Sequence, residues 1–274
     1  MAYLTVDHVT KDFPIMNGGG TRFGESKSFC VLKNVHLTVS KGEFITTIGH
    51  SGCGKSTLLN IIAGFEKGSQ GGIVLDGKEV NEPGLDRMVV FQSFALMPWL
   101  SAFNNVRLAV KAANPSWDEM RVREHTQKYI DMMGLNGAEE KKPAYLSGGM
   151  RQRVGLARAF AVEPKVLLLD EPFAQIDALT RGVIQEELVR MWWATQSTVF
   201  MVTHDVDEAI LLSDRIALMT NSPEARIAEC LEVDIPRPRS REAIIDLPEY
   251  TKLRNRVLHF LMTQGSHGKT ERRN

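Results

Sequence analysis

The alternation of apolar and polar positions predicts strands near the start of the chain. Tyr3 to Val9 alternates as a half-exposed strand does, and Cys30 to Val39 alternates again. Between them lies a glycine-rich stretch, Asn17 to Gly20, which we expect to form a surface loop. A further apolar run, Phe44 to Ile48, enters a second glycine-rich turn, and helically spaced apolar residues, Leu58 to Ile62, leave it. This last pattern predicts a strand, a loop and a helix in succession.

The middle of the chain has the periodicity of helices. Apolar residues from Ser116 to Met133 recur at helical spacing, and Ser116 with Glu119 forms the pattern of a capping box. Another helical run follows Ser147. We therefore predict a helical insert over about residues 95–160.

Two short, continuously apolar runs follow, Val166 to Leu169 and Thr198 to Val202. Such runs are typical of strands buried on both faces of a parallel sheet. The stretch Ala178 to Trp193 connects them with helical spacing, and Asp205 with Glu208 forms a second capping-box pattern. The pattern is therefore α/β on both sides of a helical insert.

The last part of the chain, from Pro236 onward, is predicted to hold one amphipathic helix followed by a polar, disordered tail. Leu253, Val257 and Leu261 share one face of that helix. We accordingly divide the chain into a domain over residues 1–232 and an extension over residues 233–274.

Composition narrows the function. The formal net charge is +0, which argues against a broad basic face for nucleic acid. The three cysteines, Cys30, Cys53 and Cys230, lack metal-ligand spacing and indicate a reducing compartment. The N-terminal residues lack a signal-peptide pattern, and no run of about 18 apolar residues would span a bilayer. We expect a cytosolic chain whose membrane role depends on a partner.

The turn after Phe44 to Ile48 fits the phosphate-loop pattern G-x-x-x-x-G-K-[ST]. Its glycines let backbone N–H groups face phosphate oxygens, and the helix dipole adds positive charge. Lys55 is placed to reach the β- and γ-phosphates, and the Ser56 hydroxyl to hold Mg²⁺. We expect these residues to bind the nucleotide: Gly49, Ser51, Gly52, Cys53, Gly54, Lys55, Ser56 and Thr57.

Further polar residues stand where predicted strands end. Asp170 and Glu171 close one apolar run, His204 follows the next, and Gln92 follows a third, Met88 to Phe91. Ligands of open α/β sheets bind at these carboxyl ends. We expect Asp170 and Gln92 to contact Mg²⁺, Glu171 to polarise a water molecule, and His204 to donate to the γ-phosphate.

The segment Leu146-Ser147-Gly148-Gly149 predicts a second anion site. Ser147 is a good N-cap, and Gly148 and Gly149 expose N–H groups at a helix start. That helix cannot easily reach the phosphate loop of its own chain, so the site is explained if it closes over nucleotide held by another subunit.

Taken in their order along the chain, these motifs resemble those of the nucleotide-binding subunit of ABC transporters. The resemblance covers residues 3 to about 230. The resemblance implies a P-loop NTPase core with a mixed, mainly parallel sheet, an antiparallel β subdomain and the inserted helical subdomain. It also implies that Phe13 stacks on adenine, that Asp177 is a D-loop residue, and that two subunits enclose two ATP molecules. The segment from Phe94 to Asn105 would then receive a helix of the membrane partner.

Two positions differ from the family pattern. Met150 stands where glutamine is commonest, and the D-loop reads Ala174-Gln175-Ile176-Asp177 instead of Ser-Ala-Leu-Asp or Gly-Ala-Leu-Asp. The second difference suggests the hypothesis that this subunit pairs with a non-identical sister and that the two nucleotide sites are unequal.

Several stretches resemble the branch that imports nitrate, taurine, alkanesulfonate and bicarbonate, and His50 with Arg87-Met88 favours nitrate. The resemblance implies an ATPase peripheral to the cytoplasmic face of the inner membrane. Its partners would be a second ATPase subunit, identical or a sister, transmembrane permease subunits and, indirectly, a periplasmic or lipid-anchored solute-binding protein. The alternatives are a soluble ABC ATPase that remodels nucleic acid or ribosomes, a P-loop kinase, and an exporter. The single cassette, the LSGG segment and the lack of a fused membrane domain argue against these in turn.

Overall fold

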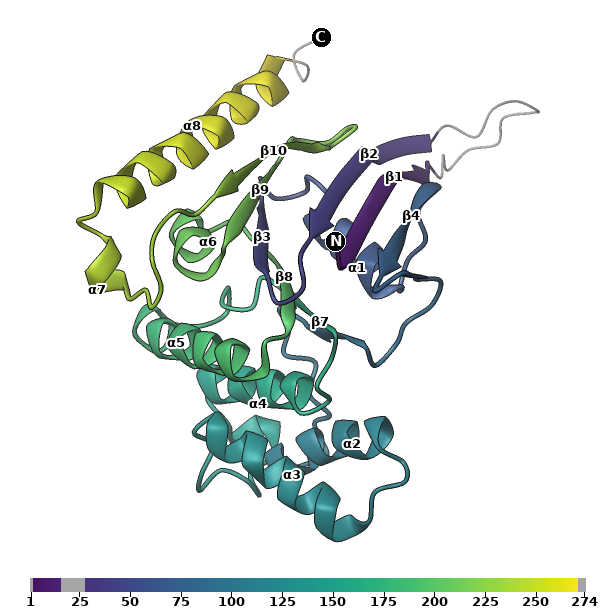
Figure 1. Cartoon of the computed structure of the whole chain (residues 1–274), viewed down its shortest axis with the longest axis vertical. Helices are drawn as coiled ribbons and strands as arrows, with labels where there is room; N and C mark the ends of the chain where they lie inside the picture. The colour runs from purple at the N-terminus through teal and green to yellow at the C-terminus, as the bar shows by residue number, and fades with distance from the viewer. Residues whose placement is uncertain (1, 16–27, 271–274) are drawn as a thin grey trace.

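The computed structural model describes residues 2–15 and 28–270 and contains two β-sheets with helices packed on them (Figure 1). The glycine-rich stretch at residues 17–20, for which we predicted a loop, lies outside the described residues. No helix in the described ranges is long and apolar enough to cross a bilayer.

The smaller sheet is antiparallel, with strand order β2-β1-β4-β5. Leu4, Val6 and Val9 of its β1 are fully buried, so this sheet shares a core with the larger one. Its strands are β1 (Leu4–Pro14), β2 (Ser28–Val39), β4 (Gln70–Leu75) and β5 (Lys78–Glu79). The two strands predicted before residue 40 are thus confirmed, and β1 extends five residues beyond Val9.

The larger sheet is mixed and mainly parallel, with strand order β10-β9-β3-β8-β7-β6. β10 is antiparallel to β9, and the other pairs are parallel. The strands are β3 (Phe44–Ile48), β6 (Arg87–Val90), β7 (Val166–Asp170), β8 (Thr198–Thr203), β9 (Arg215–Met219) and β10 (Ile227–Glu232). Val166 to Leu169 of β7 and every residue of β8 are buried, as their continuous apolar runs predict; every residue of β3 is buried as well, including its two threonines.

The helices cover the larger sheet and form the insert seen at the bottom of Figure 1. They are α1 (Lys55–Ala63), α2 (Ala102–Ala113), α3 (Glu119–Met132), the 3₁₀ turn η1 (Pro143–Tyr145), α4 (Gly148–Phe160), α5 (Ala178–Thr195), α6 (Val206–Leu212), α7 (Arg241–Ile244) and α8 (Pro248–Thr270). Side chains of β3 alternate between the core shared with the antiparallel sheet and the core beneath the helices.

The predicted capping box at Ser116 and Glu119 is wrong. Asp118 is the N-cap of α3, because its carboxylate accepts a hydrogen bond from the backbone N–H of Arg121 at 2.8 Å. Glu119 instead forms ion pairs with Arg107 and Lys111 of α2. The start of α3 is therefore determined by an aspartate two residues after the predicted cap.

The second predicted capping box is half right. Asp205 is the N-cap of α6 and accepts from the N–H groups of Asp207 and Glu208. The Glu208 side chain does not reach back, since the Asp205 N–H donates to the Thr203 hydroxyl and Glu208 accepts from Thr203 and Gln185.

The C-terminal part holds two helices where one was predicted, because a short α7 precedes α8. Helix α8 also continues to Thr270, so the prediction of a disordered tail is wrong up to that residue; residues 271–274 lie outside the described ranges. Two arginines join this part to the core: Arg237 binds Asp214 at 2.8 Å, and Arg239 donates to four backbone carbonyls. The boundary at residue 232 stays a prediction.

Candidate functional site

The larger sheet brings four functional segments to one edge. Strands β3, β8, β7 and β6 are adjacent and parallel, with Ile48 opposite Thr203, Asp170 opposite Val202, and Val90 opposite Leu169. The phosphate loop follows β3, His204 follows β8, Glu171 follows β7, and Gln92 stands two residues after β6. The expected convergence of the strand ends is therefore found.

The phosphate loop is shaped by glycine. Gly54 has φ +101°, a left-handed conformation, and a Cβ on it would lie 2.8 Å from the Leu32 side chain of β2. Directly after it, Lys55 begins α1 and is only 5% exposed. Its ammonium donates to the carbonyl oxygens of Gly49 at 2.8 Å and His50 at 3.0 Å. The loop thus wraps around a buried cation.

This cation fits an anionic ligand. Among the described residues, no carboxylate lies within 4.0 Å of the Lys55 ammonium, which is satisfied by neutral carbonyls. A buried charge without a counter-ion is costly, and a bound phosphate would supply the missing negative charge. In addition, Nδ1 of His50, at the mouth of the same loop, is buried without a hydrogen-bond partner. The residues present therefore suit a nucleotide phosphate.

Asp170 and Ser56 form the second part of the site. The Ser56 hydroxyl donates to Oδ1 of Asp170 at 2.9 Å, joining α1 to the end of β7. Burial raises the pKa of Asp170, and Glu171 acts in the same direction, while the Ser56 hydrogen bond and the Lys55 charge oppose them. A hydroxyl and a carboxylate oxygen so placed are ligands that Mg²⁺ prefers.

Glu171 and His204 form the third part. Glu171 has φ +44°, unusual for a residue with a side chain, while its N–H still pairs with the Val202 carbonyl of β8. Nδ1 of His204 lies 3.2 Å from Oε2 of Glu171. A cavity of about 60 Å³ borders both side chains, which is room for a water molecule.

Behind this edge lies a hydrogen-bond network that the sequence patterns did not reveal. Glu208 accepts from Thr203 at 2.9 Å and from Gln185 of α5 at 3.2 Å, and Arg241 donates to the same Gln185 at 3.0 Å. Burial raises the pKa of Glu208 to about 7. The network joins the residue before His204 to α5 and α7, and its only sequence signal was misread as a capping box.

The other predicted residues lie elsewhere. Phe13 is half-buried on β1 of the antiparallel sheet, with the Lys11 ammonium 4.8 Å from its ring centre. Ser147 is exposed and caps α4, its hydroxyl accepting from the N–H of Met150. Figure 1 shows α4 and α1 at different places on the molecule. The structure therefore separates the LSGG segment from the phosphate loop of its own chain.

The LSGG segment and the D-loop are neighbours. A Cβ on Gly148 would lie 3.4 Å from the Gln175 carbonyl, and one on Gly149 would lie 2.5 Å from a methyl carbon of Thr180. Asp177 caps α5 by accepting from the Thr180 N–H, and this hydrogen bond lowers the pKa of its carboxyl. Both segments thus meet at the start of α5.

Comparison with known sequences identifies the family. The sequence pattern of the family described as ABC transporter matches residues 32–174. The chain belongs to the ABC transporter family. This confirms the family resemblance and the predicted α/β fold class.

Curated relatives of this ABC protein match nearly its whole length. The nitrate import ATP-binding protein NrtD of Synechococcus elongatus is 47% identical, over 97% of this chain and 93% of the relative. The bicarbonate transport ATP-binding protein CmpD of the same organism is 48% identical, over 97% and 92%. The nitrate import ATP-binding protein NrtC, also from that organism, is 50% identical over 96% of this chain but only 38% of the relative.

Solved structures agree. The ATP-binding cassette MJ0796, in a dimeric post-hydrolysis state with ADP and Pi, matches with a TM-score of 0.71 and 30% identity. The match covers 85% of this chain and 100% of that one.

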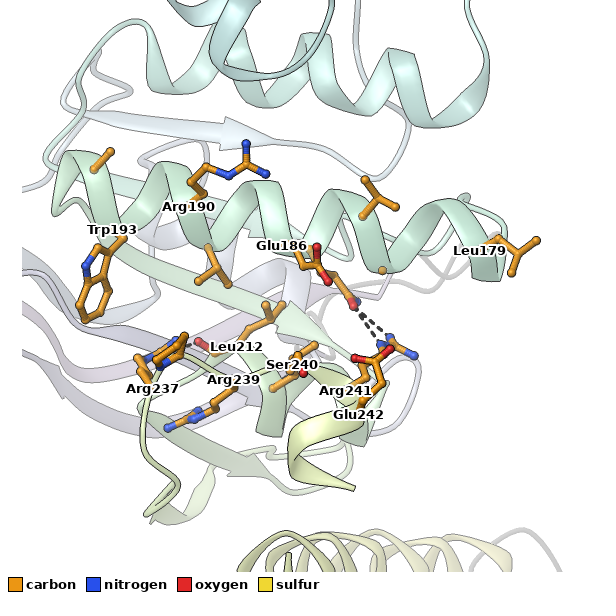
Figure 2. A pocket seen from close by; sticks show the side chains of 17 residues that line it. Leu179, Glu186, Arg190, Trp193, Leu212, Arg237, Arg239, Ser240, Arg241 and Glu242 are labelled. Atoms are coloured by element: carbon orange, nitrogen blue, oxygen red, sulfur yellow. Dashed lines mark hydrogen bonds between the residues drawn. The ribbon is translucent and has the colours of Figure 1, made fainter. Parts of the chain in front are cut away.

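A groove of about 810 Å³ lies apart from the catalytic edge, between α5 and residues 237–242 (Figure 2). Its walls include the exposed Leu179 and Trp193 of α5 and the side chains of Arg237 and Arg239. Its lining contains none of the residues that we predicted for nucleotide binding or catalysis. The groove is therefore distinct from the candidate site.

Proposed function

We propose that the chain is the ATP-hydrolysing motor subunit of an ABC importer for a small anion, nitrate. The observation that carries the proposal is the convergence of a buried lysine, a serine–aspartate pair and a glutamate–histidine pair on one sheet edge. Together these groups provide what phosphoryl transfer to water requires, namely charge stabilisation, a metal position and an oriented water.

Each group has its own task. The Lys55 ammonium exchanges its carbonyl partners for phosphate oxygens and stabilises the negative charge that develops on them. Glu171 accepts a hydrogen bond from the attacking water, which the adjacent cavity admits. His204 holds the Glu171 carboxylate and donates to the γ-phosphate.

Mg²⁺ would be held by Ser56 and Asp170, with Gln92 as a third contact. When bound, the ion neutralises charge on the β- and γ-phosphate oxygens. Burial raises the pKa of Asp170, and among the causes of the shift only Lys55 supplies a positive charge. A bound cation would add the positive charge that favours the ionised carboxylate.

The LSGG segment acts on the nucleotide of a second subunit. Ser147 is exposed at the start of α4, where the N–H groups and dipole of the helix attract an anion; Gly148 is half-buried beside it, and Gly149 is buried. Phe13 would stack on adenine, and Asp177 would lie at the junction between subunits. The relatives support either a second copy or a sister, since Synechococcus elongatus has both an NrtC and an NrtD.

The helical insert transmits nucleotide state to the membrane partner. Directly after Gln92, the carbonyls of Phe94 and Ala95 accept hydrogen bonds from Arg158 of α4 at 3.3 and 2.8 Å. Arg151 of the same helix lies over the Phe94 ring. A displacement of Gln92 therefore reaches the LSGG helix through these contacts, and permease subunits at the cytoplasmic face would receive it.

The solute is proposed from likeness to relatives, because none of the nucleotide-site residues contacts it. Nitrate and bicarbonate are both represented among the relatives at 47–48% identity. His50 and the Arg87-Met88 stretch favour nitrate.

The test is ATPase activity of the chain copurified with its permease subunits in proteoliposomes, with solute-binding protein present. We expect nitrate to stimulate hydrolysis, and bicarbonate or taurine not to. If bicarbonate stimulates hydrolysis and nitrate does not, the motor function stands and the proposed solute changes to bicarbonate. Hydrolysis that no permease subunit or binding protein affects would overturn the importer proposal.

A further inference from the structure

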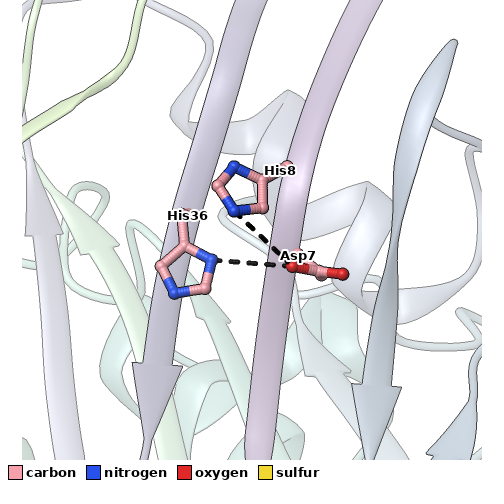
Figure 3. A group of neighbouring side chains, drawn as sticks. All are labelled: Asp7, His8 and His36. Carbon is pink, nitrogen blue, oxygen red and sulfur yellow. Dashed lines mark ion pairs between the residues drawn. The ribbon is translucent and has the colours of Figure 1, made fainter.

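Three exposed side chains that the ATPase mechanism does not use converge on the antiparallel sheet. Asp7 and His8 come from β1 and His36 from β2. Figure 3 shows Nε2 of His8 and Nδ1 of His36 pointing at the same carboxylate oxygen of Asp7, at 3.9 and 3.7 Å. The three potential ligand atoms lie within 4.8 Å of one another.

A β-bulge creates this convergence. In the pairing of β1 with β2, Val6 is opposite Leu37 and Val9 opposite Val35, so that Asp7 and His8 together face the single residue His36. In a regular strand, two successive side chains would point to opposite faces. Here His8 has φ +50°, which lets Asp7 and His8 turn toward the same neighbour.

The bulge is enforced by the other neighbouring strand. Gly71 of β4 has φ +73°, and a Cβ on it would lie 2.3 Å from the Asp7 carbonyl and 2.4 Å from that of His8. Only a glycine permits this approach of β4 to the bulge. The backbone of the bulge is therefore held by β2 on one side and by β4 on the other.

A hydrogen bond prepares His8 as a ligand. Its Nδ1 lies 2.7 Å from Oδ1 of Asn34, and because that oxygen can only accept, Nδ1 carries the proton. Neutral His8 then has its lone pair on Nε2, the atom that faces Asp7. Metal-binding histidines are commonly oriented in this way by a partner on the other ring nitrogen.

We propose that Asp7, His8 and His36 bind a divalent transition-metal ion of the zinc type, with water completing the coordination. Two imidazoles and one carboxylate form a common ligand set for such ions. Ligand atoms around a bound ion about 2.1 Å away would lie roughly 3.4 Å apart in a tetrahedral arrangement. From separations of 3.7 and 3.9 Å to Asp7, and of at most 4.8 Å within the cluster, the exposed side chains need to close by about 1.5 Å or less to reach it.

Ordinary surface ion pairs would make the same contacts, but they would need protonated histidines. The metal site instead uses the imidazoles as neutral lone-pair donors, which is the form that binds a metal ion. Hard ions such as Mg²⁺ prefer oxygen ligands, so the Mg²⁺ of the ATPase site should not compete.

The experiment is calorimetric titration of the full chain, purified without a histidine tag, with Zn²⁺ in the absence of nucleotide. Co²⁺ then serves as a spectroscopic probe of tetrahedral coordination. We expect one equivalent to bind at pH 7.5. His8→Asn and His36→Gln should each weaken binding at least tenfold. Asparagine tolerates the left-handed backbone at position 8, so that variant keeps the bulge.

His259→Gln is the matched control, since it removes an exposed histidine on α8 and should leave binding unchanged. Circular dichroism verifies that each variant is folded. If Zn²⁺ does not bind, or if it binds equally well to the folded His8→Asn and His36→Gln variants, the proposed site does not exist.

Discussion

The catalytic edge and the LSGG segment differ in how far their own chain completes them. At the edge, each functional side chain has a hydrogen-bond partner, either another functional residue or the loop that carries it. This holds for Lys55, Asp170 and Glu171. Ser147, by contrast, is exposed, and its hydroxyl contacts only the helix that it caps. The first region is assembled by strand register within one chain, whereas the second presents donors that the chain itself does not use.

This contrast shows what folding alone can achieve here. Adjacent parallel strands place the edge residues together as soon as the sheet forms. The LSGG helix α4 belongs to the insert and packs on one face of the same sheet, so the strand register does not bring Ser147 to the edge. Under the proposed function, a second subunit brings the two regions together into a complete nucleotide site.

We expect the largest effect from Glu171→Gln, at the sheet edge whose residues find their partners within the chain. The substitution keeps the shape but removes the charge that orients water, so we expect ATPase activity to fall at least about 100-fold while ATP still binds. Steady-state hydrolysis measures the loss, and size-exclusion chromatography with ATP should show a persistent pair of subunits. Glu124→Gln, an exposed substitution on α3, is the control. Retention of substantial activity by Glu171→Gln would remove it from the catalytic step.

A mixing experiment tests the contrast directly. Lys55→Ala and Ser147→Arg should each inactivate a pair of identical subunits. Mixed together, they should restore up to about half of the wild-type activity, because one composite site then holds an intact loop and an intact serine. Mixed pairs of wild type with a subunit carrying both substitutions should be inactive, so that mixture should retain only the activity of its wild-type pairs, about a quarter after random pairing. No activity in the first mixture, with about half of the wild-type activity in the second, would mean that each site forms within one chain.

Much of the edge could be predicted because each part is contiguous in sequence. The phosphate loop is one segment, and Asp170, Glu171 and His204 directly follow apolar runs whose parallel pairing is the simplest arrangement. The network of Glu208, Gln185 and Arg241 joins three helices, and nothing in the local pattern of any one of them reveals it. The bulge at Asp7 and His8 likewise depends on strand register and on Gly71, so the cluster with His36 could not be anticipated.

The buried Glu208 predicts a pH dependence of the catalytic edge's stability. Its pKa in the folded protein is raised to about 7, mainly by burial, so between the unfolded value and 7 the native state binds more protons than the unfolded state. Stability is therefore highest at low pH in this window and is lost as pH rises. We expect this group to lower the free energy of unfolding by about 2 kcal/mol between pH 5 and 7.

Glu208→Gln should remove that loss, which urea denaturation at several pH values would detect as a flatter profile. Glu232→Gln, at the exposed end of β10, should keep the wild-type profile. Parallel profiles for wild type and Glu208→Gln would show that Glu208 titrates as an ordinary carboxyl.

We expect the smallest effect, a loss of stability, from adding a side chain at Gly149. A Cβ there would lie 2.5 Å from the Thr180 methyl, so Gly149→Ala should destabilise the protein by about 1–2 kcal/mol through overpacking. Gly148→Ala, whose Cβ would lie 3.4 Å from the nearest atom outside α4, should cost less. Thr180→Ser removes the obstructing methyl, so Gly149→Ala/Thr180→Ser should regain most of the stability in urea denaturation. If ATPase activity returns with it, the glycine serves packing within its own chain. If stability returns but activity does not, the space above Gly149 is needed by the nucleotide of the other subunit.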